Sequence, residues 1–383
     1  MSFFGDTRKK ITLQEIKNAT LPLILDTGVY TISSKLVPTL ASEEKSMFRI
    51  PAGAMVTIEM TEGAQLGVDV YSPNLHPQFS LIDMEDQSSL TIKGGTWGPV
   101  PHGSVITLLG QKNLLQGEQA TFLNFGSHAI HMPVSSPQSE ILMKYCKFIS
   151  KGTGCIGKEA IRLVNQLGKL SKLELECSQK KFTEDITSAL VEKNDMYDVQ
   201  AIHAVGAQKI TVFQCLFDLE SYPTISFQQA TSAVSCKQCS VVDIKGCTIH
   251  IRLFASLEFD NRSEGFDVVA LSMEDCSRVS VENIMAPAIV AETGHASVIK
   301  LGRCAMAKLK TNTVEKIQAG SDHEWVKIPQ VIVFYSSECI LNLEDSSNKV
   351  LEMVSMANPL FIGIESFPTS KATLVMQQPR KGF

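Results

Sequence analysis

The sequence predicts an all-β solenoid in which short strands stack in parallel, coil upon coil. The phrase SLIDMEDQSSLTIKGGTW, which begins at Ser80, returns in similar form as VALSMEDCSRVSVENI, which begins at Val269. Both phrases place apolar side chains at the same offsets from one central position. The offsets come in pairs two residues apart, which is the period of a β-strand.

Gln87 and Cys276 mark the central position, offset zero, of the two phrases. Apolar side chains occupy offsets minus five, minus three, plus three, plus five, and then plus eight or plus ten. In order, they are Ile82, Met84, Leu90, Ile92 and Trp97 in the first phrase, and Leu271, Met273, Val279, Val281 and Ile284 in the second. Each unit is therefore expected to contain three short strands, with corners where the alternation breaks.

Other segments fit the same frame. They are residues 202–217, 234–249 and 299–309, followed by a unit with Glu338 at offset zero. In this last unit Val333, Tyr335 and Leu341 stand at minus five, minus three and plus three. The units are unevenly spaced, which predicts a coil of fixed cross-section with connecting loops of variable length. Helical repeats would need long stretches of 3.6-residue period, and a β-sandwich would not keep one residue class at fixed offsets.

The chain is expected to form a single elongated domain, 1–383. LPLILDTGVYTISS and FRIPAGAMVTIEM predict the first coils within 1–60, with TLQEIKNA as a short helix that caps the end of the stack. Coils follow over 61–345, and 346–383 is expected to cap the other end. Between 155 and 195, GKEAIRLVNQLGKL and FTEDITSALVEK have a helical period and predict an excursion of two helices.

Charge and hydropathy narrow the classes of partner. With 35 Lys and Arg against 40 Asp and Glu, and a net charge of -5, the chain has no excess of positive charge for phosphates, so no nucleic acid is expected. Apolar runs of signal-peptide or membrane-span length are missing from the sequence. We therefore expect a chain that is not secreted through a signal peptide, does not insert into membranes, and is cytoplasmic or incorporated in a virion.

Ten cysteines raise the question of a metal site. Cys236, Cys239 and Cys247 have a C-x2-C spacing with a third thiol, which suits tetrahedral zinc. In the repeat frame, however, they occupy offsets that Met273, Cys276 and Ile284 fill in the next unit. This favours reduced, buried thiols that pack as small hydrophobes, so no metal is expected. Nucleotide-binding loops and G-x-S-x-G are missing too, and no cofactor is expected.

The segments SSLTIKGGTW and CSRVSVENIMA resemble coils of the right-handed parallel β-helix of pectate-lyase-like and polygalacturonase-like proteins. The resemblance covers most of residues 80–345. It implies a right-handed parallel β-helix. For the enzymes of the family it also implies cleavage of polysaccharides by acidic residues on one face.

Two short stretches are similar to catalytic motifs of that family. The stretch that contains Glu264 and Asp267 is similar to the first motif, and the stretch around His295 to the third. The paired aspartate and the R-I-K motif are missing, which leaves no second acid to activate water or protonate a leaving group. Glu264, Asp267 and His295 are therefore catalytic candidates only if the chain is a glycan-processing enzyme.

Binding candidates lie in two charged stretches. Asp260 and Arg262 belong to EFDNRSEGFD, which is expected to be a loop that projects over a neighbouring face and is otherwise simply solvated. His323 and Trp325 belong to SDHEWVK, where the indole suits either a sugar ring or a protein interface.

Two further motifs have a structural interpretation beside a functional one. His128 and His131 in FGSHAIHMP have a spacing that could hold a metal on a helix, but the neighbouring Gly, Ser and Pro predict a loop with exposed or capping histidines. Trp97 in GTWGPVPHG could stack on a sugar. Its offset points inward and predicts packing in the core.

Three functions remain open from the sequence. The first, which the missing acid pair and the cysteine content favour, is a non-catalytic structural or interaction protein, a rigid rod with binding loops in a larger, viral or cytoskeletal, assembly. Its expected partners are other proteins or copies of itself. The alternatives are a polysaccharide hydrolase or lyase, and a glycan-binding spike or fibre.

Overall fold

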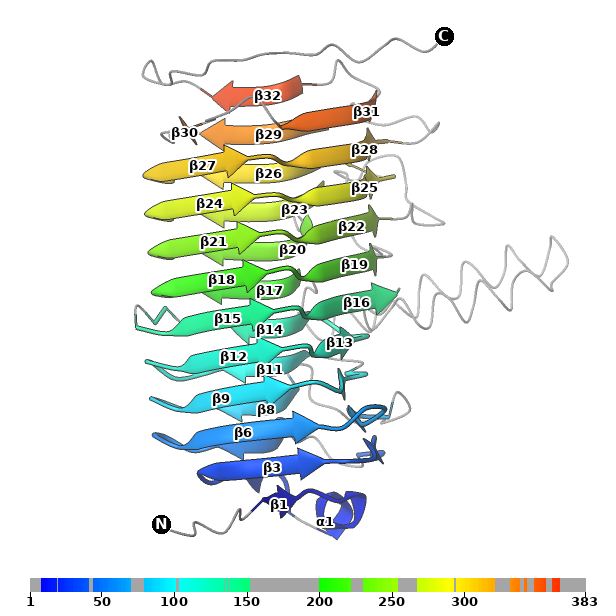
Figure 1. Ribbon diagram of the computed structural model, residues 1–383, viewed down its shortest axis with the longest axis vertical. Helices are drawn as coiled ribbons and strands as arrows, with labels where there is room; N and C mark the ends of the chain where they lie inside the picture. The colour runs from blue at the N-terminus through cyan, green and yellow to red at the C-terminus, as the bar shows by residue number, and fades with distance from the viewer. Residues whose placement is uncertain are drawn as a thin grey trace, which may run out of the picture.

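The computed structural model describes residues 8–18, 20–40, 44–69, 79–100, 103–133, 135–136, 138–151, 200–221, 230–253, 267–292, 294–320, 331–337, 341–342, 348–355 and 360–365. Nearly all the regular structure in them is β-strand. Strands of successive coils lie above one another in a tall stack (Figure 1). The predicted parallel β-helix is confirmed.

Each coil contributes one strand to each of three parallel sheets. Sheet A contains, in spatial order, β1 (Lys9–Lys10), β3 (Gly28–Ile32), β6 (Met55–Met60), β9 (Ser89–Lys93), β12 (Leu114–Glu118), β15 (Glu140–Lys144), β18 (Lys209–Phe213), β21 (Val241–Lys245), β24 (Arg278–Glu282), β27 (Met306–Lys310) and β30 (Leu341–Asn342). Sheet B contains β2 (Leu23–Ile24), β5 (Ser46–Ile50), β8 (Ser80–Met84), β11 (Ser104–Leu108), β14 (His128–Met132), β17 (Gln200–Val205), β20 (Ala230–Lys237), β23 (Asp267–Glu274), β26 (Ala296–Gly302), β29 (Val331–Ser337) and β32 (Leu360–Glu365). Sheet C contains, from the N-terminal end, β4 (Lys35–Leu36), β7 (Gln65–Leu66), β10 (Thr96–Trp97), β13 (Thr121–Leu123), β16 (Lys147–Lys151), β19 (Leu216–Ser221), β22 (Thr248–Leu253), β25 (Met285–Ala291), β28 (Thr313–Ala319) and β31 (Lys349–Ser355).

Residues at matching offsets form columns along the axis of the stack. In sheet A, one column of paired and buried side chains runs through Leu90, Leu115, Ile141, Ile210, Val242 and Val279. The two similar phrases thus place Leu90 and Val279 at equivalent positions, as predicted. Trp97 is fully buried, as its inward offset predicted, and its Nε1 donates a hydrogen bond to the Gly94 carbonyl at 3.0 Å.

The last predicted unit was wrong by one residue. Ile299 pairs with Phe334 and not with Val333, and Leu301 pairs with Ser336 and not with Tyr335. Leu341 pairs with Ala307 as the frame predicted. Ser337 and Leu341, which pair with Gly302 and Ala307, are therefore one residue closer together in the sequence than Gly302 and Ala307 are. An offset counted back across that corner slips by one.

The corner between sheets A and C has the same construction in successive coils. Two residues separate the strands, and the first of them has a positive φ, for example 55° at Gln119, 55° at Tyr145 and 48° at Gln214. This left-handed conformation is unfavourable for residues other than glycine. It turns the chain sharply and directs the N–H to the next coil, where Tyr145 donates to the Phe213 carbonyl at 3.0 Å and Gln214 to the Lys245 carbonyl at 2.8 Å.

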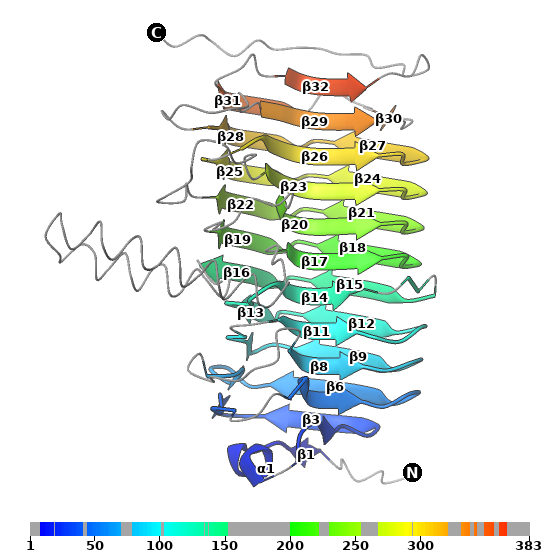
Figure 2. The same cartoon turned by 180° about the vertical axis from the view of Figure 1, so that it is seen from behind.

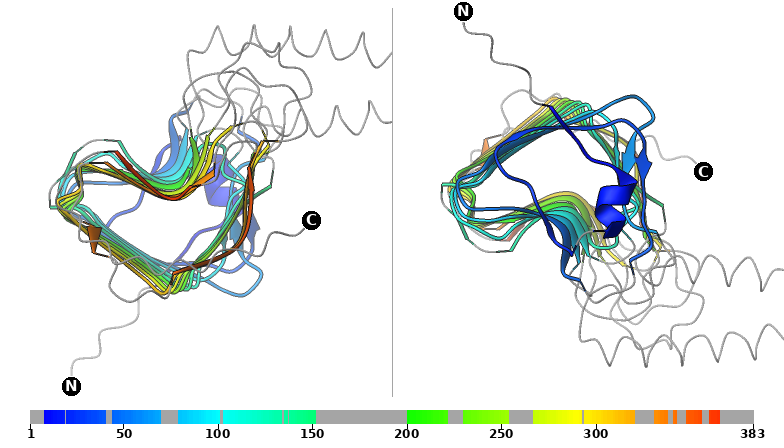
Figure 3. Two further views of the ribbon diagram at one scale, coloured as in Figure 1. Left: turned by 90° about the horizontal axis from the view of Figure 1, so that it is seen from above. Right: turned by 90° about the horizontal axis from the view of Figure 1, so that it is seen from below.

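The N-terminal end of the stack is covered as predicted. Helix α1 (Leu13–Asn18) lies at this end (Figures 1 and 3) and buries Ile16. The helix begins with a capping box: the Glu15 carboxylate accepts the Thr12 N–H at 2.7 Å, and the Thr12 hydroxyl accepts the Glu15 N–H at 3.3 Å. Of the helices that the described ranges contain, none is long and apolar enough to cross a membrane.

The outer face of sheet A carries a row of alternating charge, which we call the charge ladder. Paired residues in its first part are Glu59, Lys93, Glu118 and Lys144, and in its second part Lys245, Glu282 and Lys310, with Phe213 between the parts. Each described ion pair is modest in strength because it is exposed. Together they favour the observed order of pairing, because a strand that paired with the coil after next, and not with the next coil, would place two like charges side by side.

The two helices predicted between 155 and 195 lie outside the described residues. Beyond residue 345 the described chain continues the stack with β31 and β32, which pair with β28 and β29.

Candidate functional site

Two rows of polar side chains run along the outer face of sheet B. Figure 2 shows this sheet in front, and Figure 3 shows that the sheet bends toward the interior of the stack. The bend brings the rows into contact, because the Ser80 hydroxyl donates to Thr107 Oγ1 at 3.0 Å. We call ten of these residues the polar seam: Ser80, Ser104, His128, Gln200 and Ser232 in one row, and Asp83, Thr107, His131, His203 and Ser235 in the other.

Three histidines cluster in the middle of the polar seam. His131 and His203 are paired residues of β14 and β17, and His128 lies opposite them across the bend. The rings of His128 and His131 are stacked, with centroids 4.2 Å apart and planes 6° apart. The ring of His203 lies 5.5 Å from each of the others. His128 Nδ1 lies 3.0 Å from the Ser127 hydroxyl, whereas His203 Nδ1 is buried without a hydrogen-bond partner.

Burial keeps these imidazoles neutral. It lowers the pKa of His131 to about 4, with a smaller contribution from the charge of His203. Burial is also the main cause that lowers the pKa of His128 well below 6.5, with His131 and His203 adding to it, and burial lowers the pKa of His203. A neutral imidazole has one donor and one acceptor nitrogen. The cluster is therefore uncharged at neutral pH and gains charge only in acid.

Asp83 lies toward the N-terminal end of the same seam. Its burial raises the pKa of the carboxyl group, and hydrogen bonds from Ser46 and Ser80 together with the charge of Arg49 oppose that rise. The group is therefore a weaker acid than an exposed aspartate.

The seam was largely missed by sequence reasoning. His128 and His131 were expected in a loop, and that expectation was wrong, because the five residues from His128 to Met132 form β14. The neighbouring glycine, serine and proline bound this strand without disrupting it. A usable signal was present: His131 and His203 both stand at offset minus four, an outward position between two inward ones, in successive coils.

Asp267 and His295 were candidates in the sequence, and the structure brings them together. Asp267 is the first residue of β23, and its Oδ1 accepts the backbone N–H of His295 at 3.1 Å. The Val268 N–H donates to the His295 carbonyl at 2.9 Å. The two residues thus join adjacent coils at the corner where sheet B begins. The other candidates, Glu264, Asp260, Arg262, His323 and Trp325, lie outside the described residues.

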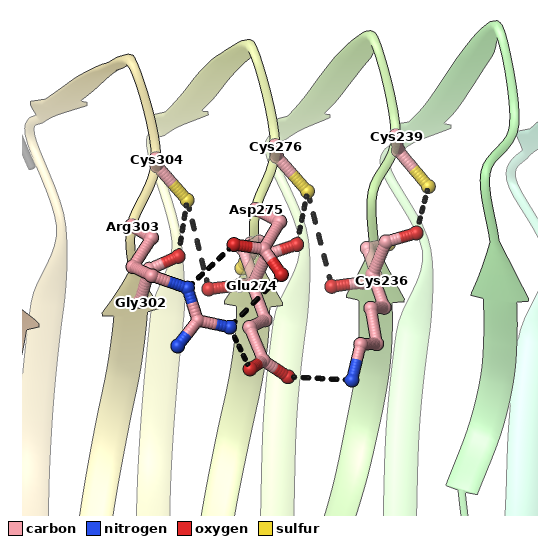
Figure 4. Close-up of polar contacts among 10 residues, drawn as sticks. Cys236, Cys239, Glu274, Asp275, Cys276, Gly302, Arg303 and Cys304 are labelled. Atoms are coloured by element: carbon pink, nitrogen blue, oxygen red, sulfur yellow. Dashed lines mark hydrogen bonds and ion pairs between the residues drawn. The ribbon is translucent and has the colours of Figure 1, made fainter.

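Six of the seven described cysteines line two inner corners of the stack, and Figure 4 shows one of these corners. Cys239, Cys276 and Cys304 occupy one position in three successive coils, and each is buried. Cys276 Sγ lies 3.4 Å from the Glu274 carbonyl oxygen and 3.8 Å from that of Cys236. Thiols here fill a narrow corner and donate to carbonyls at the strand ends, which matches the predicted role as small buried side chains.

An exposed ion network lies on the outer side of this corner. The Arg303 guanidinium donates to both Asp275 oxygens, at 2.6 and 2.9 Å, and to Glu274 at 2.6 Å. The Nζ atom of Lys237 lies 3.4 Å from the second carboxylate oxygen of Glu274, Oε2. The hydrogen bond from Arg303 is the main cause that lowers the pKa of Asp275. These contacts link three coils, so the network is structural.

The thiols of Cys239 and Cys276 are expected to be unreactive in the folded protein. The hydrogen bond with Cys236 is the largest cause that raises the pKa of Cys239 to about 12, and hydrogen bonds with Cys239 and Cys304 raise that of Cys276. A maleimide should therefore label them at least about 100-fold more slowly than in urea, as mass spectrometry of peptides can measure. An exposed control is Met306→Cys, since Met306 is 48% exposed. Native labelling of Cys276 as fast as that control would contradict this assignment.

Within the described ranges, no group of three or more His, Cys, Asp or Glu side chains is arranged to hold a metal ion. The rings of His128 and His131 are stacked, and that of His203 is tilted by 46° to both. Comparisons with family models, with curated proteins and with solved structures find no match to this chain.

Proposed function

We propose that this chain is a non-catalytic β-helical scaffold, a rigid rod of the right-handed, pectate-lyase-like type that serves as a structural or interaction component of a larger assembly such as a viral particle. The protein partners or further copies of the chain bind to its faces and to the segments that connect its coils. The proposal rests mainly on how the coils are connected.

Long connections occur at one corner of the stack. Each connection from sheet A to sheet C that follows β12, β15, β18, β21, β24 or β27 has two residues. In contrast, four of the connections from sheet C to sheet B are long. They are residues 152–199, 222–229, 254–266 and 320–330. The sequence that varies between coils is thus added at one corner, while the three sheets keep their register. This arrangement suits a scaffold that carries variable segments on a constant support.

The contacts of Asp267 and His295, the catalytic candidates among the described residues, support a structural role. The Asp267 carboxylate accepts a backbone hydrogen bond from the adjacent coil, as a residue that fixes the start of a strand would do. Its partner His295 contributes its backbone to the ladder through the Val268 N–H.

The assembly is tested by size-exclusion chromatography with light scattering and by affinity capture from the source. We expect an oligomer or a stable complex with a defined protein. A monodisperse monomer that captures no protein would contradict the proposal.

The enzymatic alternative is tested on a panel of acidic polysaccharides, with reducing ends and unsaturated products as readouts. We expect no turnover by the wild type. The informative variants are Glu264→Gln and Asp267→Asn, with Asp243→Asn on sheet A as the control for loss of a carboxylate. Turnover that disappears in Asp267→Asn but persists in Asp243→Asn would replace the scaffold by a glycan-processing enzyme, and glycan binding without turnover would favour a receptor-binding fibre.

A further inference from the structure

The histidine cluster, His128, His131 and His203, has no role in the proposed scaffold and differs from the rest of the polar seam. The seam is otherwise made of hydroxyl and amide side chains apart from Asp83. Three titratable rings lie within 5.5 Å of one another, and one buried nitrogen, His203 Nδ1, has no hydrogen-bond partner. An unpaired buried nitrogen is costly to keep, and a charged ring in the same place costs more.

Among the described residues of the two rows, the neighbours of the histidines carry no charge that would compensate a protonated ring. In the two rows, β11 presents Ser104 and Thr107, and β17 presents Gln200 beside His203. On the other side β20 presents Ser232 and Ser235. These side chains are uncharged at any pH of interest.

The nearest titratable group in the described rows is Asp83 on β8. It lies two coils from β14, roughly 10 Å by the spacing of strands. Because burial raises the pKa of its carboxyl group, Asp83 loses its charge at a higher pH than an exposed aspartate does.

We propose that the histidine cluster is an acid-sensitive switch that opens the rod between β11 and β20. Protonation places two or three cations within 5.5 Å of each other in a partly buried seam. Charge repulsion and the cost of desolvation then favour a state in which β14 and β17 separate from their neighbours and the rings reach water.

The direction of the effect follows from proton linkage. Because folding lowers the pKa of the histidines, from 6.5 to about 4 for His131, the opened state binds more protons than the closed state between these values. The closed state is therefore fully stabilised above about pH 6.5 and loses stability as the pH falls toward 4.

A solenoid confines this opening to the coils concerned. Each coil contacts only its neighbours above and below, so coils far from the cluster keep their own contacts when β14 and β17 separate. The inference goes beyond the scaffold proposed above, because a rod with any function, or with none, would respond to acid in this way.

The test is hydrogen exchange by mass spectrometry at neutral pH and at about pH 5, corrected for the intrinsic exchange rate. Protection of β14 and β17 should fall by roughly tenfold or more in acid, whereas that of β24 and β27 stays constant. In a triple variant, each histidine takes the residue that an adjacent coil has in the same row: His128→Gln, His131→Thr and His203→Ser. This variant should lose the acid response. The control Ser272→Ala, in the row of His131, should keep it.

Three results would overturn the switch. One is an equal loss of protection in the triple variant and in the wild type. Another, which needs no variant to fold, is a direct titration by NMR in which all three imidazoles titrate at or above pH 6.5 in the folded protein. Loss of protection in acid along the whole stack would equally overturn a local switch. These outcomes do not depend on whether the chain assembles with a partner, so failure of the switch and failure of the scaffold are separable.

Discussion

The replacement Gly98→Ala is expected to unfold the coils around β10 and β13. A Cβ at this position would lie 1.9 Å from the Leu123 carbonyl oxygen, a backbone atom of the next coil that cannot rotate away. Gly98 also has a φ of +123°, where residues with a side chain are strained. Strain and clash together should cost more than about 4 kcal/mol, which places this change among the most damaging single substitutions. Urea denaturation followed by circular dichroism measures the effect.

The matched control is Gly63→Ala. Gly63 has a positive φ of +76°, but a Cβ there meets no atom within 4 Å. Only the conformational cost remains, about 1 to 2 kcal/mol. Equal losses of stability in the two variants would show that the approach of the coils does not restrict position 98.

A second large effect is expected for Phe148→Ala. The ring of Phe148 lies between those of Phe122 and Phe217, with centroids 4.8 Å from each and planes tilted by 1° and 6°. All three rings are fully buried in the interior beside sheet C. Removal of the middle ring leaves a cavity between two coils and should cost about 3 to 5 kcal/mol.

The half-buried aromatic residue Phe213 provides the comparison. Its ring makes an edge contact with Tyr145 at 5.7 Å on the outer face of sheet A, and Phe213→Ala should cost about 1 kcal/mol or less. Because the loss at Phe148 is local, hydrogen exchange should reveal faster opening of β13, β16 and β19 than of β27. If Phe213→Ala destabilises the protein as much as Phe148→Ala, the aromatic stack contributes less than its burial indicates.

The repeat frame predicted the core closely because a solenoid repeats one packing problem many times. Leu90, Val242 and Val279 have equivalent neighbours in their different coils. A shared offset is therefore strong evidence of a shared environment. Counting failed where a corner changed length, as between β29 and β30, since an offset carries no information about the turn. The zero position itself differs: Cys276 is buried there, whereas Gln87 is exposed and the buried residue is Ser88.

The candidate site was harder to predict. The candidates from the sequence were mainly acidic residues in loops. His128 and His131 were expected in a loop because turn-forming residues stand beside them. The bend of sheet B, which stacks these two rings, comes from three-dimensional packing and has no single-residue signature. Asp267 and His295 were candidates because their stretches are similar to two catalytic motifs. The two residues are indeed close, but the contact joins the Asp267 side chain to the backbone N–H of His295.

The charge ladder on sheet A has a consequence for how such a chain can lengthen. In the run Glu59, Lys93, Glu118 and Lys144, copying one coil would set two equal charges side by side, whereas copying two consecutive coils would preserve the alternation. Duplication within a gene should therefore be tolerated best in even numbers of turns, so that electrostatics imposes a two-coil unit of growth on a rod whose geometry would accept any number.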